Sequence, residues 1–231
     1  METTNFEKVK EILKTFVSIE PVPTNEMLVL HPFLNTKYVL DENKEMVDVF
    51  AKKEYFERFK KVINRNIDKA QNVHMIFLHI TKPYKMVCFK YICDYLSEQD
   101  YGELLKDCWT MEEFTSKNPD VSKKEMVSFF KRAKKEYIMD EEELKVYNNL
   151  PEQVTIYRGV RDKRWARELS WTLDYEQAEW FATRFNSETS IVYEVTIPKS
   201  EILTFINDRD EQEIIIDPYN LKKYEIKEMV L

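Results

Sequence analysis

The chain has 231 residues, of which 43% are hydrophobic and 13% aromatic, enough apolar surface for a folded core and too much for an intrinsically disordered chain. Only two glycines occur, Gly102 and Gly159, which excludes a glycine-rich phosphate loop of the Walker or Rossmann kind. The formal net charge of -7 argues against a dedicated nucleic-acid-binding protein, whose affinity depends on basic residues.

The three cysteines, Cys88, Cys93 and Cys108, lack CxxC spacing and are odd in number, so we expect neither a disulfide framework nor a zinc knuckle. None of the three histidines has metal-ligand spacing, and we predict no metal. The first residues mix charged and apolar side chains, which predicts neither a signal peptide nor a membrane span. We therefore expect a cytoplasmic protein without a membrane partner.

The first part of the chain predicts helices. Thr4 and Glu7 have capping-box spacing before an apolar stripe, which predicts a helix to residue 17. A second helical pattern extends from about Lys44 to Ala70.

Two further capping boxes follow. Ser122 with Glu125 opens a helix whose apolar stripe continues to residue 137. Asp140 with Glu143 opens another helix, which has to end at or before the proline at position 151.

After residue 151 the apolar period changes from three-four to two, which predicts strands. We expect strands over 154–158, 191–197, 202–206, 213–216 and 224–226, and a helix over 174–185 that Asp174 caps. Helices followed by mostly antiparallel strands indicate an α+β fold.

Arg158 is the first of several polar residues that the packing of a hydrophobic core does not explain. Strand alternation puts its side chain on the same face as Val154 and Ile156, where an unpaired guanidinium is costly. It therefore needs an anion, which is either an acidic side chain of the protein or a ligand. Gly159 follows, and its lack of a Cβ allows a ligand to approach the backbone closely.

Two pairs of polar side chains follow, a pair of hydroxyls and a pair of carboxylates. The members of each pair are two positions apart. Ser170 and Thr172 point to one side of a short strand, where they either hold a ligand or form the solvent face of an edge strand. Glu211 and Glu213 have the same spacing in an extended segment, and their mutual repulsion should raise the proton affinity of at least one. Such a carboxylate pair suits glycosyl transfer, whereas the alternative is a charged turn before a strand.

The order and spacing of these motifs, YRG at 157–159, SWT at 170–172 and EQE at 211–213, resembles the mono-ADP-ribosyltransferases of the Arg-Ser-Glu class. The resemblance covers roughly residues 150 to 220 and implies an ADP-ribosyltransferase-like fold, with a mostly antiparallel two-sheet β core and a preceding helical lobe. The resemblance also implies two parts of the chain. Residues 1–84 are an N-terminal helical region that recognises the target or covers the core, and residues 85–231 are the catalytic domain. The composition and size look like those of a bacterial or phage effector.

The resemblance further implies a role for each site residue. Arg158 contacts the phosphate and ribose region of NAD, and Gly159 offers backbone groups to the nicotinamide carboxamide. Ser170 holds the nicotinamide ribose and positions the catalytic glutamate, and Thr172 stiffens the same cleft. Glu213 is the catalytic residue, and Glu211 faces the acceptor, as is typical of enzymes that modify arginine. Two aromatic residues are candidates for stacking on the nicotinamide: Trp180 and Phe181.

NAD is thus the expected substrate, and the expected acceptor is a macromolecule, in the first place a protein side chain such as arginine. A nucleic-acid acceptor is an alternative because basic residues cluster over 123–135, although a solvated helix surface explains the same run. A third possibility is an interaction module with this fold and no catalytic activity.

Overall fold

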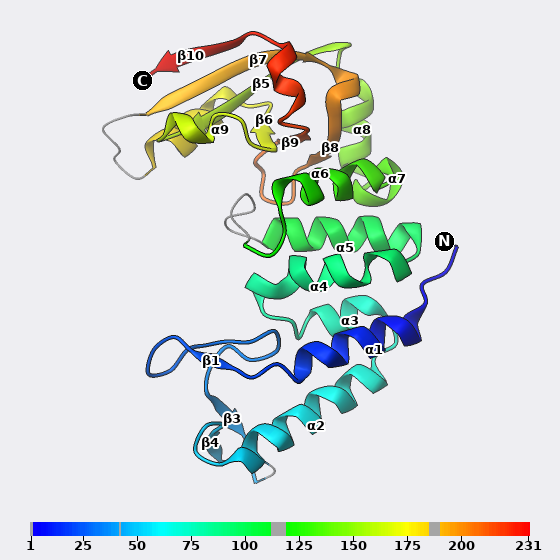
Figure 1. The fold of residues 1–231 in the computed structure, drawn as a ribbon. Coiled ribbons are helices and arrows are strands. Elements are labelled where there is room, and N and C mark those ends of the chain that lie inside the picture. The colour runs from blue at the N-terminus through cyan, green and yellow to red at the C-terminus, as the bar shows by residue number, and fades with distance from the viewer. Residues whose placement is uncertain (1, 42, 112–118, 185–189) are drawn as a thin grey trace. The chain divides into compact units, whose positions relative to one another are not determined.

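The computed structural model describes residues 2–41, 43–111, 119–184 and 190–231 (Figure 1). They form two compact units, residues 1–104 and 105–231. The expected boundary between residues 84 and 85 falls inside the first unit. The α+β class predicted from the sequence is confirmed by helices and a six-stranded antiparallel sheet. No helix among the described residues is both long and apolar enough to cross a membrane.

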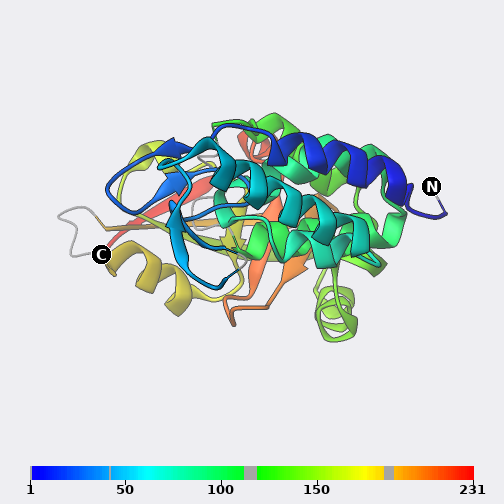
Figure 2. The same ribbon diagram turned by 90° about the horizontal axis from the view of Figure 1, so that it is seen from below.

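The first unit is mainly helical. Its helix α1 packs against α2 and α4, and Figure 2 shows α1 and α2 side by side. Val9, Leu13 and Val17 of α1 are completely buried, at the spacing that the apolar stripe predicts. The helical elements of this part are α1 (Phe6–Val17), α2 (Lys53–Lys69), α3 (Val73–Phe77), η1 (Lys82–Tyr84), α4 (Lys85–Ile92), η2 (Cys93–Tyr95) and α5 (Glu98–Met111), the last of which continues into the second unit.

The start of the first helix differs from the sequence prediction. Asn5, not Thr4, is the N-cap, and its side chain accepts a hydrogen bond from the backbone of Lys8. The Thr4 hydroxyl instead donates to Asp100 Oδ2 and accepts a hydrogen bond of 2.8 Å from the Ser97 backbone. The capping-box interpretation of Thr4 is therefore wrong, because a tertiary contact takes its hydroxyl.

Two small hairpins in the first unit were not expected. Strand β1 (Val22–Pro23) pairs with β2 (Val29–Leu30), and β3 (Tyr38–Leu40) pairs with β4 (Met46–Asp48). The predicted helix from Lys44 is consequently wrong at its start. Lys44 has a φ of 64°, which no helix tolerates, and the chain forms β4 and a turn over 49–51 before α2 begins at Lys53.

The second unit begins with the end of α5 and three short helices, α6 (Lys123–Arg132), α7 (Lys135–Ile138) and α8 (Glu141–Asn149). Both predicted capping boxes, at Ser122 and at Asp140, are confirmed. The single apolar stripe to residue 137 is wrong, because Ala133 has an extended backbone with a ψ of 134° and separates α6 from α7.

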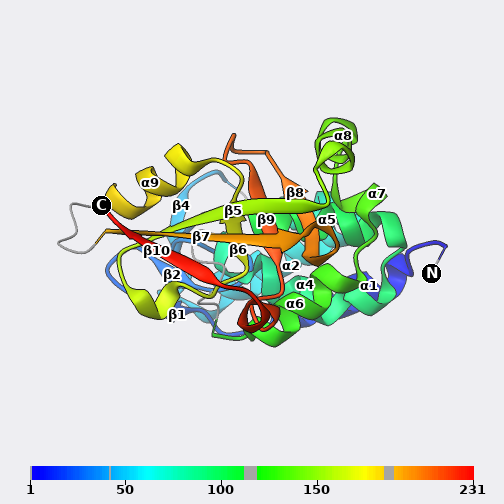
Figure 3. The same ribbon diagram turned by 90° about the horizontal axis from the view of Figure 1, so that it is seen from above.

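A six-stranded sheet follows, with strands in the order β10-β7-β5-β6-β9-β8 and every neighbouring pair antiparallel. Figure 3 shows β10, β7 and β5 side by side, with α9 (Tyr175–Thr183) next to them. The two halves of the sheet join at one residue pair, Tyr157 with Thr172. The strands are β5 (Gln153–Val160), β6 (Ser170–Thr172), β7 (Ile191–Pro198), β8 (Ile202–Ile206), β9 (Glu213–Ile216) and β10 (Ile226–Val230).

Most of the predicted β elements agree with these bounds. The last strand begins at Ile226 rather than Tyr224, because η6 (Asn220–Lys223) precedes it. Asp174 caps α9 as predicted and accepts a hydrogen bond of 2.8 Å from the Glu176 backbone. The predicted end of this helix at residue 185 lies outside the described residues.

Candidate functional site

Three strands of the second unit bring Arg158, Ser170 and Glu213 together, although 55 positions separate the first from the last. Strand β6 lies between β5 and β9, so Ser170 has the strand of Arg158 on one side and the strand of Glu213 on the other. Arg158 Nη1 donates a hydrogen bond to the Ser170 carbonyl, and the Ser170 side chain hydrogen-bonds to the Glu213 carboxyl. The three residues of the predicted NAD site therefore share one place in the fold.

Arg158 is half-buried, and its Nε donates to the Trp165 carbonyl at 2.8 Å. Burial lowers the pKa of its guanidinium to about 10, against the opposing charges of Glu168 and Glu213. The negative charges of these two carboxylates partly offset the effect of burial on Arg158. Glu168 was not singled out from the sequence; it is buried and also pairs with Lys123 at 2.7 Å.

Gly159 has a packing role that the sequence did not indicate. A Cβ at this position would stand 1.7 Å from the Ala178 carbonyl oxygen and 2.8 Å from the Ala182 nitrogen. The side without a Cβ is therefore filled by the backbone of α9 and is not open to a ligand, contrary to our expectation. A contact of the Gly159 backbone with nicotinamide stays a prediction.

The two hydroxyls of β6 lie inside the sheet, so they are not the solvent face of an edge strand. Thr172 is buried; its hydroxyl donates to the Glu211 carbonyl at 2.8 Å and accepts from the Asp174 backbone at 3.0 Å. Thr172 thus ties the segment that carries Glu211 to the start of α9. A role of Thr172 in stiffening an NAD cleft stays a prediction.

Glu213 is a buried carboxylate, with 5% of its surface exposed. Burial raises its pKa, whereas hydrogen bonds from Ser170 and from Trp109 oppose that rise. The Trp109 indole Nε1 donates to Glu213 Oε2 at 3.1 Å. Repulsion from Glu211, which we expected to be the cause, contributes less than burial.

Trp109 was missed by sequence reasoning. It lies on α5, 104 positions before Glu213, and no local motif marks it. Its side chain is 1% exposed and contacts the edge of Phe130 with ring centroids 5.0 Å apart. A fully packed indole gives the carboxyl a donor whose position hardly varies.

The segment before Glu213 is a turn, not an extended strand. Asp210 and Gln212 have φ values of 56° and 45°, and the Gln212 backbone donates to Asn207 Oδ1 at 2.9 Å. The expectation that Glu211 and Glu213 share one face of an extended segment is therefore wrong. Both carboxylates nevertheless meet again at one cation.

That cation is Arg209. Its Nη2 lies 2.9 Å from Glu211 Oε2 and 3.8 Å from Glu213 Oε2. Its Nη1 donates to the Thr110 carbonyl at 3.3 Å. A guanidinium thus lies between the two carboxylates that the sequence marked for chemistry.

The same turn is held from α5 and α8 by a charge network around the buried Glu143. Lys106 Nζ lies 2.7 Å from Glu143 Oε2 and 2.8 Å from Asp208 Oδ1, and Glu143 Oε1 accepts from the Asn207 backbone at 2.7 Å. Burial alone would lower the pKa of Lys106, but its hydrogen bonds to Asp208 and Glu143 outweigh burial and raise it. The acidic side chains here, including Asp140, surround an ammonium group and so form a structural network.

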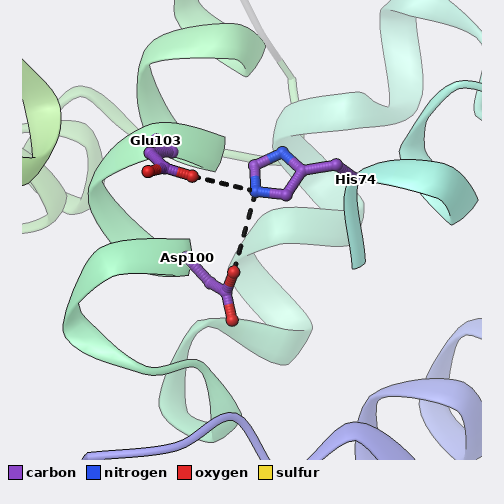
Figure 4. A group of neighbouring side chains, drawn as sticks. All are labelled: His74, Asp100 and Glu103. Carbon is purple, nitrogen blue, oxygen red and sulfur yellow. Dashed lines mark ion pairs between the residues drawn. The ribbon is translucent and has the colours of Figure 1, made fainter. Parts of the chain in front are cut away.

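A second group of titratable side chains lies in the first unit (Figure 4). His74 Nε2 lies 3.7 Å from Asp100 Oδ1 and 3.4 Å from Glu103 Oε2. The other oxygen of Asp100 accepts hydrogen bonds from Thr4 and from Ser97. The group therefore links α3, α5 and the residues before α1, which indicates a structural junction of that unit.

Three residues of the basic run over 123–135 have partners inside the second unit. Lys123 pairs with Glu168, and Lys131 pairs with the buried Asp217. Lys135 donates to two backbone carbonyls of β8, and burial lowers its pKa to about 8. These contacts are structural, which reduces the positive surface that a nucleic acid could use.

The two aromatic candidates for stacking on nicotinamide are not core residues. Trp180 is 51% exposed and Phe181 is half-buried, and their ring centroids lie 5.1 Å apart. The Arg184 guanidinium lies 5.0 Å from the Trp180 centroid and 4.7 Å from that of Phe181.

Comparison with protein-family models, with curated proteins and with solved structures finds no match to this chain. The chemistry that the site can perform has to follow from the properties of its own residues. A buried carboxylate that is fixed by an indole and a hydroxyl can stabilise a positive charge developing on a neighbouring atom. An adjacent guanidinium can hold an anionic substrate.

Proposed function

We propose that the chain is an NAD-dependent mono-ADP-ribosyltransferase, which cleaves the bond between nicotinamide and ribose and transfers ADP-ribose to a macromolecule. The acceptor is a protein side chain, arginine in the first place. One observation carries the proposal: Glu213 is a buried carboxylate fixed by Trp109 and Ser170, and Arg158 lies beside it.

The charge that develops during the reaction determines the role of Glu213. Nicotinamide leaves as a neutral molecule, so positive charge develops on the ribose carbon that it leaves. Ionised Glu213 stabilises this charge and accepts a hydrogen bond from the ribose hydroxyl beside it. Its position is set before reaction, because hydrogen bonds from two other elements hold it.

Arg158 faces the anionic part of NAD in this proposal. Two of its five N–H groups donate to backbone carbonyls, of Trp165 and Ser170, and these bonds fix its orientation. The charges of Glu168 and Glu213 keep it protonated in spite of its burial. An oriented, charged guanidinium is suited to a pyrophosphate group.

The join between the two halves of the sheet supports an ADP-ribosyltransferase-like fold. Arg158 and Gly159 directly follow Tyr157, which forms with Thr172 the single register pair between β5 and β6. The proposal places the anionic part of NAD beside Arg158 at this join. The catalytic domain in this proposal comprises residues 85–231, and residues 1–84 recognise the target or cover the core.

An arginine acceptor is supported by the contacts of Glu211. Its carboxylate already binds a guanidinium, that of Arg209, at 2.9 Å. The same oxygen can take the proton of an incoming guanidinium when its nitrogen attacks the ribose carbon. Thr172 keeps the backbone of Glu211 in place for this role.

A nucleic-acid acceptor is the second candidate, favoured by the basic run over 123–135. Neutralising Lys131 or Lys135 does not test it, because both lysines have structural contacts. Lys124, on the exposed start of α6, is a better position for that test. An inactive interaction module is the third candidate, and release of nicotinamide from NAD by the purified protein would exclude it.

The test is labelling with NAD that carries the label in its adenylate part. The full chain is incubated with labelled NAD and a cell lysate, and equal samples are then treated with protease or with nuclease. We expect protease alone to remove the label, and no label to appear with Glu213→Gln. Removal by nuclease would support the nucleic-acid acceptor, and equal labelling by Glu213→Gln would overturn the assignment of the catalytic residue.

A further inference from the structure

The guanidinium of Arg209 lies where the proposed reaction needs an acceptor of ADP-ribose, so the chain itself can supply that acceptor. Its Nη2 lies 2.9 Å from Glu211 Oε2, within reach for proton transfer, and 3.8 Å from Glu213 Oε2. We propose that Arg209 is a modification site, ADP-ribosylated by the same chain that carries it. This inference rests on the proposed function and adds the residue that the reaction modifies first.

The two carboxylates have different roles toward this one nitrogen. Glu213 stabilises the positive charge on the ribose carbon as nicotinamide leaves. That carbon therefore has to lie next to Glu213. A nucleophile has to lie close to that carbon and within hydrogen-bond distance of a base. Arg209 Nη2 meets both conditions, because it contacts Glu211 and lies beside Glu213.

The turn presents Arg209 in a defined way. Nη1 donates to the Thr110 carbonyl at 3.3 Å, which leaves Nη2 on the side of the carboxylates. The backbone around it is fixed by the bond from Gln212 to Asn207 Oδ1, at 2.9 Å. The side chain is 40% exposed, so a ligand can reach it without unfolding of the turn.

The step balances without a further reactant. The bond between the ribose carbon and the nicotinamide nitrogen breaks, and its electron pair leaves with neutral nicotinamide. A lone pair of Arg209 Nη2 forms the new bond to that carbon. The proton that this nitrogen loses passes to Glu211 and then to water, so the modified side chain remains a cation and nothing is oxidised or reduced.

The experiment uses the purified full chain with NAD and no added acceptor. Nicotinamide release is followed, and the chain is digested and mapped by mass spectrometry. We expect the mass of one ADP-ribosyl group on the peptide that contains Arg209, both after incubation and in part of the chain as purified from cells that contain NAD. Arg209→Lys keeps a positive charge beside Glu211 but removes the guanidinium, and we expect no adduct at position 209.

Arg164 provides a matched control. It is also paired with a carboxylate, Asp162, and its side chain is 82% exposed, which is more than that of Arg209. Modification governed by exposure alone would favour Arg164, so an adduct there at a similar level, or an adduct that Arg209→Lys does not remove, overturns the proposal. Arg164→Lys should leave the adduct at Arg209 unchanged.

Two further outcomes separate this inference from the proposed function. Nicotinamide release without an adduct at Arg209 overturns the inference and leaves the transferase assignment intact, whereas absence of release overturns both. Wild-type chain mixed with Glu213→Gln chain tests whether the reaction is intramolecular. We expect the Glu213→Gln chain to stay unmodified, and its modification by the wild-type chain would contradict a reaction within one chain.

Discussion

Substitution of Gly159 by alanine tests how the sheet and α9 are held together. The new Cβ would stand 1.7 Å from the Ala178 carbonyl oxygen, whereas real Cβ atoms do not come within 3.0 Å of such an atom. The helix backbone would have to retreat by about 1.3 Å, because a carbonyl cannot turn away as a flexible side chain can. That movement would open the cluster of Ala178, Ala182 and Val192, all of them completely buried.

Overpacking of a core costs roughly 1–3 kcal/mol, and occasionally more. Since three backbone atoms of α9 clash here, we expect Gly159→Ala to lower the free energy of unfolding by about 3 kcal/mol. Urea denaturation followed by circular dichroism measures this value. Gln153→Ala, on an exposed position of the same strand, is the control and should change stability by less than about 0.5 kcal/mol. A Gly159→Ala chain as stable as the wild type would refute the packing role of this glycine.

Three further substitutions test the site. Trp109→Phe removes the indole donor that lowers the pKa of Glu213, so the acid limb of the pH profile for nicotinamide release should move to higher pH, with a loss of about tenfold in rate; an unmoved limb would contradict the positioning role. Lys106→Met leaves Glu143 buried without its cation, and urea denaturation should report a loss of roughly 3 kcal/mol, which further substitution of Glu143→Gln should partly restore. Glu211→Gln should reduce transfer to an acceptor more than NAD hydrolysis, and an equal loss in the two assays would exclude an acceptor-facing role.

Local patterns predicted the second unit well. The capping boxes at Ser122 and Asp140, and the strands before and after α9, appear where polar and apolar residues alternate with clear periods. The three motif residues Arg158, Ser170 and Glu213 meet because antiparallel pairing of short strands brings distant segments to one place. Their order and spacing in the sequence predicted that they belong together, and their role in binding NAD stays a prediction.

Contacts between distant residues could not be predicted in this way. Nothing near Trp109 indicates that its indole donates to Glu213, and nothing near Thr4 indicates that Asp100 takes its hydroxyl from the helix cap. The segment from Glu211 to Glu213 was expected to be extended because nothing in the sequence marks the positive φ of Gln212. Gly159 was expected to leave space for a ligand. In the structure the backbone of α9 occupies that space, so the glycine serves packing instead.

The most direct test of the central claim is the release of nicotinamide from NAD by the wild-type chain and by Glu213→Gln, with NAD affinity measured on both by calorimetry. Removing the buried negative charge takes away the group that stabilises the developing cation and leaves Arg158 in place. We predict that Glu213→Gln binds NAD with little change in affinity and releases nicotinamide about 100- to 1000-fold more slowly. Equal release by the two chains, or no release by the wild type, would contradict the account.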